Sequence, residues 1–600
     1  MTEDKGSGQI AQGLRARMQD HLAFLYGGQE AKAVWQQLEG ILEDFHHEHP
    51  RLTAGGAAMP LTERDSILIT YGDQFREQGS GDRTEVPPLQ TLNGVLAGTL
   101  HPPISGVHLL PFFPYSSDDG FSVIDYTQVN PDMGSWDDVE RLNEDYRLMF
   151  DAVLNHVSRE SEWFQRFLDG DPHYAEWFIA VDPDAPKDGV SQVVRPRAKP
   201  LLTPVETAQG ETLVWTTFSE DQIDLNYAHP PVLLRMIEIL LYYVEQGAEI
   251  IRLDAIAYLW KEIGTRCIHL EGAHRVVKLF RCVLEAVAPG TILITETNVP
   301  HEENISYFGD GTDEAQMVYQ FPLAPLVMHS IVSGSARTLS TWAAGLETPS
   351  DQTAFFNFTA SHDGIGVMPA RGLLSEIEIQ ELVDTTIEHG GQVSYKTNAD
   401  GSRSVYELNI SYFDALSDPN AAEAQATQVQ RFVVSQAIML ALAGVPGIYV
   451  HSLIGSRSWQ EGVEITGRKR TINRKKLSRS EMEGEMADSN SLRRQVYEAY
   501  YRLLEVRSAN PAFHPQGAQR TLLLEDGVFA LLRTSPDGGQ RILCAHNVTE
   551  EVQVVHLYPG DLGLATEDTW SDLLSGEEYA VVGDGLVLDL TPYAVRWLRV

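Results

Sequence analysis

The sequence predicts a (β/α)₈ barrel, because eight short apolar runs alternate with segments that have the composition of helices. Four of these runs carry a carboxylate at or just after their end, where a buried parallel strand opens into the top of a barrel. Helix-compatible segments between the runs include 231–246, 274–288 and 428–443. The eight predicted strands are 67–71, 106–110, 147–151, 248–253, 291–295, 317–319, 353–358 and 447–450.

We expect several further parts around this barrel, because two gaps between strands are too long to be ordinary loops. The gap after the third strand predicts an inserted domain, and the gap after the seventh predicts an insertion that shapes the acceptor pocket. The first residues look helical, and the last change to short strands that predict a β-sandwich. The parts are an N-terminal helical extension (1–64), the barrel (65–156 and 228–510), the inserted domain (157–227), the acceptor-loop insertion (364–420) and a C-terminal β-domain (511–600).

The composition limits the possible partners of the protein. With 84 acidic against 45 basic residues, the net charge of −39 argues against nucleic-acid binding, which needs clustered cations. No run of about 18 apolar residues and no signal pattern at the N-terminus are present, so we expect a cytoplasmic protein that does not bind membranes. Cys267, Cys282 and Cys544 are scattered and lack metal-ligand spacing, so no zinc site is expected. No other cluster of metal ligands stands out, and we expect no metal site. We expect a monomer or a homodimer.

Three carboxylates and one arginine carry the predicted chemistry. Arg252 and Asp254 are two apart on one predicted strand, so their side chains share the barrel interior. An arginine there lowers the pKa of the carboxylate and keeps it ionised, as a nucleophile requires. Glu296 and Asp363 follow two further strands, and a separation of about 5 Å between Asp254 and Glu296 would mean glycoside cleavage with retention. A lone aspartate more often belongs to a buried ion pair, but the set in this order favours sugar chemistry.

These segments resemble the four signature regions of glycoside hydrolase family 13, the α-amylase family, at 151–156, 250–254, the run ending in Glu296, and 361–363. The resemblance implies that Asp254 is the nucleophile, Glu296 the general acid/base and Asp363 the stabiliser of the transition state. It also implies that the glucosyl unit is held by Asp118, Phe121, His156, Arg252, His362 and Arg474.

A narrower resemblance, to the sucrose phosphorylase subfamily, lies in the stretches 118–125, 134–138, 195–197, 261–265 and 362–366. The resemblance implies inorganic phosphate as co-substrate, release of α-glucose 1-phosphate, and no cofactor. Phosphate must approach two carboxylates, so cations have to offset the repulsion. Arg195 and Arg197 are the candidates, with Arg197 preferred. The alternative is that these arginines belong to a solvated basic loop that does not bind phosphate. The resemblance also assigns Tyr258 to phosphate binding.

Two positions depart from the sucrose phosphorylase pattern and put sucrose in doubt as the substrate. Asn298 replaces a histidine of that subfamily, and Glu407, after Tyr406, replaces a glutamine. The resemblance places Asn298, Tyr406 and Glu407 where phosphate and the acceptor are expected to bind. The stretches 213–227, 292–301 and 401–407 look instead like glucosylglycerate phosphorylases, and this similarity extends over nearly the whole chain. Glycerate carries a carboxylate, so a cation is expected near Glu407. We choose Arg403 for this role, with Lys261 and Arg266 in reserve.

We therefore expect a retaining α-glucoside phosphorylase, which interconverts 2-O-α-D-glucosylglycerate and phosphate with α-D-glucose 1-phosphate and D-glycerate through a β-glucosyl-enzyme. Glucosylglycerol phosphorylase, sucrose phosphorylase, and a phosphate-independent α-glucosidase or transglucosidase are the alternatives within the same family. A catalytically inactive binding module is the alternative of another class, and the complete carboxylate set argues against it. The expected partners are a small glucoside and phosphate.

Overall fold

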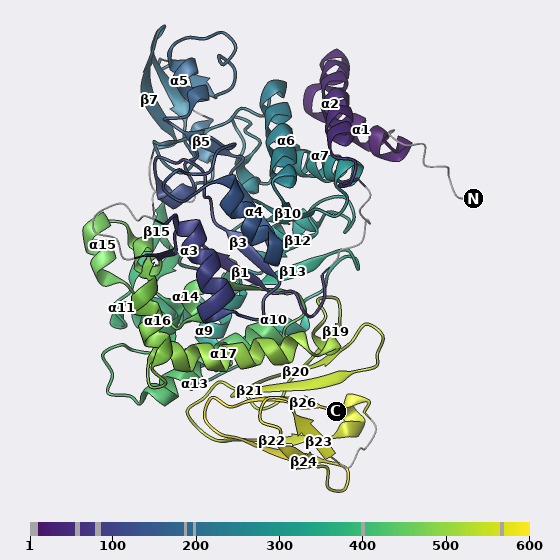
Figure 1. Ribbon diagram of the computed structural model, residues 1–600, viewed down its shortest axis with the longest axis vertical. Helices are drawn as coiled ribbons and strands as arrows, with labels where there is room; N and C mark the ends of the chain where they lie inside the picture. The colour runs from purple at the N-terminus through teal and green to yellow at the C-terminus, as the bar shows by residue number, and fades with distance from the viewer. Residues whose placement is uncertain are drawn as a thin grey trace.

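Eight parallel strands close into a barrel at the centre of the computed structural model, which describes residues 10–53, 61–77, 86–184, 189–195, 200–397, 402–564 and 569–600 (Figure 1). The strands are almost wholly buried, which explains their apolar sequences. Every predicted barrel strand is confirmed to within two residues at each end. Around the barrel the order is β1 (Ile67–Thr70), β17 (Val445–Tyr449), β13 (Ala354–Asn357), β12 (Met317–Tyr319), β11 (Ile292–Thr295), β10 (Ala248–Leu253), β4 (Arg147–Ala152) and β3 (Gly106–Leu109).

Helices surround the barrel and connect its strands. The three stretches predicted from composition correspond to α6, α7 and α13, and α6 begins with two prolines, which suit the first turn of a helix. The main helices of this layer are α3 (Pro88–Gly94), α4 (Trp136–Asp145), α6 (Pro230–Glu245), α7 (Glu271–Val287), α9 (Leu323–Ser333), α10 (Arg337–Ala344), α13 (Gln425–Ala441) and α17 (Leu492–Ser508).

The segment between β4 and α6 forms a small lobe at the carboxyl ends of the strands. A short antiparallel pair, β5 with β9, joins this lobe to the barrel, and three further strands pair in the order β6-β8-β7. The elements of the lobe are β5 (His156–Ser158), α5 (Glu162–Leu168), β6 (Ala180–Val181), β7 (Leu202–Thr207), β8 (Gly210–Trp215) and β9 (Gln222–Asp224).

The segment after β13 adds a second antiparallel sheet beside the pocket, with strand order β14-β16-β15. Helix α11 precedes its hairpin and begins at a capping box formed by Ser375 and Glu378. The elements are β14 (Ile365–Gly366), α11 (Glu376–Glu388), β15 (Gln392–Thr397), β16 (Arg403–Asn409) and α12 (Tyr412–Leu416). Two short helices, α14 (Val450–Leu453) and α15 (Gln460–Thr466), follow β17.

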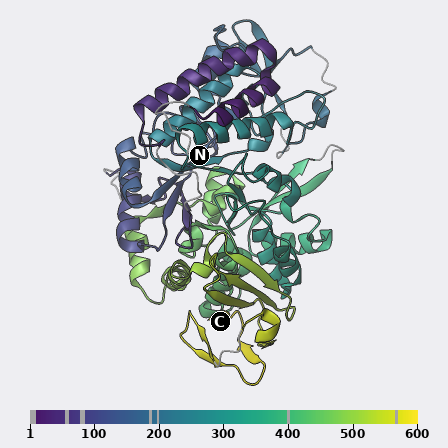
Figure 2. The same cartoon turned by 90° about the vertical axis from the view of Figure 1, so that its right-hand side faces the viewer.

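The two ends of the chain pack on opposite sides of the barrel (Figures 1 and 2). At one end, α1 (Gln12–Tyr26) and α2 (Gly28–Glu48) lie against α6 and α7, and Arg17 Nη1 donates to Glu285 of α7 at 3.1 Å. At the other end, a six-stranded sheet, β19-β20-β21-β26-β23-β24, faces the pair β22-β25. Side chains of both sheets, such as Leu543 and Leu588, share one apolar core, as expected for a sandwich. The strands are β19 (Ala518–Leu522), β20 (Val528–Thr534), β21 (Arg541–Asn547), β22 (Gln553–Leu557), β23 (Thr569–Asp572), β24 (Glu578–Ala580), β25 (Leu586–Leu590) and β26 (Val595–Arg599).

Candidate active site

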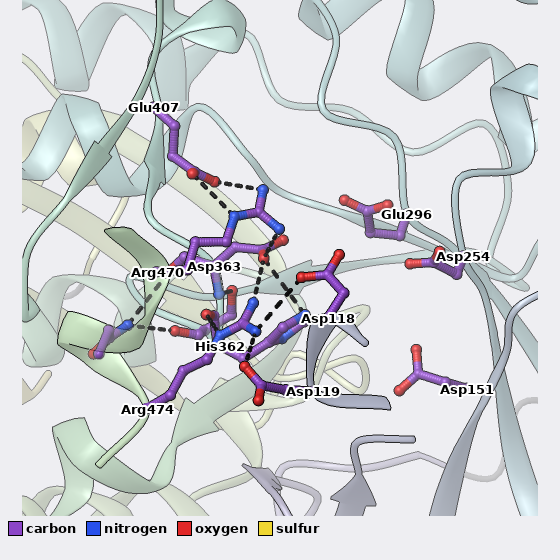
Figure 3. Close-up of polar contacts among 12 residues, drawn as sticks. Asp118, Asp119, Asp151, Asp254, Glu296, His362, Asp363, Glu407, Arg470 and Arg474 are labelled. Carbon is purple, nitrogen blue, oxygen red and sulfur yellow. Dashed lines mark hydrogen bonds and ion pairs between the residues drawn. The ribbon is translucent and has the colours of Figure 1, made fainter. Parts of the chain in front are cut away.

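Three barrel strands deliver carboxylates into one pocket. Asp254 and Glu296 directly follow the last residues of β10 and β11, and Asp363 lies on the loop after β13. All three line the same cavity. Figure 3 shows Asp254 and Glu296 on one side of it, with Asp363 on the facing side. The structure therefore brings together the three residues that the sequence marks as catalytic.

Arg252 organises the carboxylates from beneath and is 2% exposed. Its Nη1 donates to Asp254 Oδ1 at 2.8 Å and also to Asp151, while its Nη2 lies 3.7 Å from Glu296 Oε2. Asp151 is held in turn by His108 Nε2 at 2.6 Å. One guanidinium thus compensates three carboxylates, a network whose Asp151 and His108 members sequence reasoning did not assign.

The pKa values of the facing carboxyls differ in a way that suits acid catalysis. Burial raises the pKa of Glu296 to about 7, and the negative charges of Asp254 and Asp363 add to this effect while Arg252 opposes it. Burial also raises the pKa of Asp254, so the lowering expected from Arg252 is present but outweighed. Arg252 is hydrogen-bonded to Asp254 and further from Glu296, so a single proton shared by the pair belongs on Glu296.

Two arginines hold Asp363 in its ionised form. Burial alone would raise the pKa of Asp363, but Arg470, with Nη1 at 2.6 Å from Oδ1, and Arg474, with Nη2 at 3.3 Å, keep it well below its usual range. Arg474 also donates from Nε to the carbonyl of His362 at 2.8 Å and pairs with Asp119 at 2.6 Å. Both arginines come from the segment that follows α15, so this segment and the Asp363 loop form one wall of the pocket (Figure 3).

Arg470 is a site residue that sequence reasoning missed. Its Nε and Nη2 donate to the two carboxylate oxygens of Glu407 at 3.1 and 2.9 Å, as a two-pronged ion pair. The cation expected near Glu407 is therefore Arg470, 63 residues away in the chain. The sequence feature that could have identified Arg470 is its position in the basic run Arg468-Lys469-Arg470, four residues before Arg474.

Asp118, Phe121, His156 and His362, four of the residues assigned to the glucosyl unit, line the pocket, whereas Arg252 and Arg474 contact its carboxylates without lining it. The rings of Phe121 and His362 are stacked, with centroids 4.7 Å apart, and His156 Nε2 lies 2.9 Å from the Phe121 carbonyl oxygen. Asp118 is 3.8 Å from Arg474 Nη1 and adopts a positive φ of 54°, which is uncommon for a residue with a side chain. This arrangement offers a flat apolar surface flanked by acceptors and donors, as a sugar ring requires.

The residues assigned to phosphate and the acceptor are only partly brought together. Tyr258, Asn298 and Tyr406 line the pocket, and Asn298 Oδ1 is buried without a hydrogen-bond partner. Arg403 begins β16, is exposed, and is not among the lining residues. Arg195 belongs to the inserted lobe, also outside the lining, and Arg197 lies outside the described residues.

The two reserve cations do not enter the pocket either. Lys261 is 4% exposed and bound to Asp224 at 2.9 Å and to Asn155 at 2.7 Å. Arg266 is exposed, and its carbonyl accepts a hydrogen bond from the backbone N–H of Val194 in the inserted lobe. Neither side chain lines the cavity that contains the carboxylates.

The described ranges of the chain show neither a metal site nor a membrane span. Within them, His, Cys, Asp and Glu nowhere gather in threes to hold a metal ion, and Cys267, Cys282 and Cys544 are buried free thiols. None of the helices there combines the length and the apolar character needed to span a bilayer. The absence of a cofactor stays a prediction.

Residues 103–364 match the family model described as the α-amylase catalytic domain, so fold and site define an α-amylase family enzyme. Glucosylglycerate phosphorylase of Allomeiothermus silvanus is 52% identical over 585 residues, which cover 98% of this chain and 98% of that protein. Glucosylglycerate phosphorylase of Spirochaeta thermophila is 48% identical over 589 residues, 97% and 98% of the two chains. The crystal structure of sucrose 6F-phosphate phosphorylase from Thermoanaerobacter thermosaccharolyticum superposes with a TM-score of 0.71 at 26% identity, and covers 82% of this chain and 96% of that one. The chain belongs to the glucosylglycerate phosphorylase family, within the α-amylase family, which confirms the resemblances seen in the sequence.

Proposed function

We propose that the protein is a retaining phosphorylase of 2-O-α-D-glucosylglycerate. One observation carries this proposal: relatives with that activity in their names are 48% and 52% identical over nearly the full length of both chains. The pocket agrees with it, because Asp254, Glu296 and Asp363 line one cavity. We further propose a cytoplasmic monomer or homodimer that uses phosphate as co-substrate and no metal or other cofactor.

The first half-reaction transfers the glucosyl unit to the enzyme. The Asp254 carboxylate attacks the anomeric carbon, and the bond from that carbon to the glycosidic oxygen breaks. Glu296 gives its proton to this oxygen, so D-glycerate leaves with a hydroxyl group. A pKa of about 7 leaves a large share of Glu296 protonated near neutral pH, as a general acid needs. The ionised Asp363 is suited to stabilise the positive charge that develops on the sugar ring.

The second half-reaction hands the glucosyl unit to phosphate. A phosphate oxygen attacks the anomeric carbon, the ester bond to Asp254 breaks, and the Glu296 carboxylate takes the proton that phosphate releases. Two inversions at the same carbon give net retention, so the product is α-glucose 1-phosphate. Asp118, Phe121, His156, Arg252, His362 and Arg474 would hold the sugar throughout, and Arg195, Arg197 and Tyr258 would receive phosphate.

The residues around the acceptor distinguish this pocket from that of a sucrose phosphorylase. Asn298 and Glu407 replace residues of the sucrose phosphorylase pattern, and the buried Oδ1 of Asn298 is free to accept a hydrogen bond from a hydroxyl of the acceptor. Tyr406 completes this side of the pocket.

The test is release of α-glucose 1-phosphate from glucosylglycerate, glucosylglycerol and sucrose, each with and without phosphate. We expect a strong phosphate-dependent signal with glucosylglycerate. A preference for glucosylglycerol or sucrose would be consistent with the proposed mechanism but would refute glucosylglycerate as the substrate. Release of free glucose in the absence of phosphate would refute the proposed phosphorylase activity.

A further inference from the structure

A short anionic acceptor requires a cation inside the catalytic pocket itself. In glucosylglycerate the glycosidic oxygen and the carboxyl group are attached to the same carbon of the glyceryl unit. The carboxylate therefore lies within a few ångström of the oxygen that Glu296 protonates. Around it the pocket presents the carboxylates of Asp118, Asp254 and Asp363, which would repel it, while Glu296 holds the proton that it donates. Of the other candidate cations in the described ranges, Arg403, Lys261 and Arg266 are not among the residues that line this pocket.

Arg470 is the only lysine or arginine among the described residues that line this pocket. The two lining histidines do not substitute for it, because burial lowers the pKa of both, that of His362 to about 3. Arg252 lies beneath the pocket with its N–H groups directed to carboxylates. Arg470 is 23% exposed and also lines the neighbouring outer cavity, so it stands where the two spaces meet.

The hydrogen bonds of Arg470 leave part of its guanidinium for a ligand. A guanidinium carries five N–H groups, and two of them donate to Glu407, while Nη1 forms an ion pair with Asp363 Oδ1 at 2.6 Å. Glu407 is 2% exposed, and both of its oxygens are occupied by Arg470. The group presented to the acceptor is therefore the arginine, and Glu407 lies behind it.

We propose that Arg470 binds the carboxylate of the glyceryl unit and that Glu407 is the positioning residue that fixes its guanidinium. This assignment rests on the proposed function and makes the pair the determinant of acceptor choice. A glutamate suits the position better than a glutamine. Its two carboxylate oxygens each accept a charge-assisted hydrogen bond and so fix the plane of the guanidinium, whereas a glutamine side chain has only one acceptor oxygen. Glu407, which was expected to contact the acceptor directly, instead positions the arginine that contacts it.

The experiment compares glycerate with glycerol as acceptors for α-glucose 1-phosphate. Glycerol lacks the carboxylate, so the ratio of the two kcat/KM values cancels any effect of a variant on Asp363 or on folding. In Arg470→Gln both values should fall, and the glycerate value should fall about tenfold or more beyond the glycerol value, the size of one charge-assisted hydrogen bond. Arg470→Lys should give an intermediate ratio. Arg468→Gln, a neighbouring exposed cation, is the control and should leave the ratio unchanged.

The positioning role of Glu407 has its own readout. Glu407→Ala should raise the KM for glycerate about tenfold with little change in kcat for glycerol, and Glu407→Gln should restore part of the loss. Equal losses for both acceptors in Arg470→Gln would overturn the proposal, because Arg470 would then act on Asp363 alone. A change confined to the KM for phosphate would also overturn it. Failure of the wild-type protein to use glycerate would refute the proposed function instead, before any variant is made.

Discussion

At the scale of single residues, the protonation states of the site depend on a small number of arginines, each of which contacts more than one carboxylate. Arg252 serves Asp151, Asp254 and Glu296, and Arg470 serves Asp363 and Glu407. The carboxyl with the weakest share of these cations is Glu296, whose nearest guanidinium nitrogen is 3.7 Å away. Burial raises the pKa of Glu296, and Arg252 at this distance does not cancel the rise.

Glu296→Gln should therefore stabilise the folded protein, and more so at high pH. The pKa of Glu296 is about 7 in the folded protein against 4.5 for an unperturbed glutamate. Stability from the protonated form is fully present below the lower value and is lost as pH rises through the higher one. Glutamine is neutral at every pH and avoids this loss.

The gain should be larger by roughly 2 kcal/mol at about pH 8 than at about pH 5.5, as measured from denaturant midpoints of variant and wild type. The same gain at both values would show that Glu296 titrates normally in the folded protein.

The residue scale also shows where sequence reasoning stops. Asp254, Glu296 and Asp363 were identifiable because each follows an apolar run that predicts a strand end. Arg470 was not, because its contact with Glu407 spans 63 residues and depends on how two loops fold back on each other. Arg403, chosen for its nearness in sequence, begins the exposed end of the same hairpin strand.

At the scale of elements, the hairpin of β15 and β16 has to lie very close to the Asp363 loop. Strand β16 pairs with β14, which begins two residues after Asp363, and Glu407 thus faces the catalytic loop. Gly364 allows this approach, because a Cβ there would lie 2.5 Å from the Leu408 carbonyl oxygen and 2.6 Å from Glu407 Cγ. The contact is with backbone, so the strand would have to move.

Gly364→Ala should displace β16 and separate Glu407 from Arg470. We expect the kcat of phosphorolysis to fall about tenfold or more, with helix content and cooperative unfolding retained. Gly484→Ala in α16 (Arg479–Ala487) is the matched control, because nothing lies within 4 Å of its Cβ, and it should leave kcat unchanged. Normal activity in Gly364→Ala would show that the hairpin does not need this close approach.

The elements themselves were largely predictable, and for a physical reason. Barrel strands are buried on both faces, so each appears in the sequence as a continuous apolar run bounded by polar residues. The pairing of the inserted strands was not predictable, because β6, β7 and β8 are partly exposed and their order β6-β8-β7 follows from tertiary contacts. The domain boundaries drawn from the sequence stay predictions.

At the scale of the whole molecule, one buried arginine connects the barrel to the region that leads into the C-terminal sheets. Arg507, in α17, is 1% exposed and donates to four backbone carbonyls: those of Glu63 and Asp65 before β1, Gly444 before β17, and Phe513 after α17. Three separate stretches of chain thus meet at one guanidinium.

Arg507→Met should destabilise the protein by about 2 kcal/mol or more, because it leaves buried carbonyls without donors. The thermal midpoint should fall while the KM for glycerate changes by less than about twofold, since the active site is at the other end of the strands. Arg494→Met, on the exposed face of the same helix, removes an i,i+4 pair with Glu498 and should cost less than about 0.5 kcal/mol. Equal effects of the two variants would contradict the connecting role of Arg507.

The proposed mechanism requires that Asp254 carries the glucosyl unit and that phosphate removes it. The most direct measurement uses Glu296→Gln with α-glucosyl fluoride, a donor whose leaving group needs no acid. Peptide mass mapping should find one glucosyl residue on Asp254, and added phosphate should discharge it as α-glucose 1-phosphate; Asp254→Asn should carry none. A glucosyl residue on another side chain, or discharge to free glucose that phosphate does not redirect, would contradict the account.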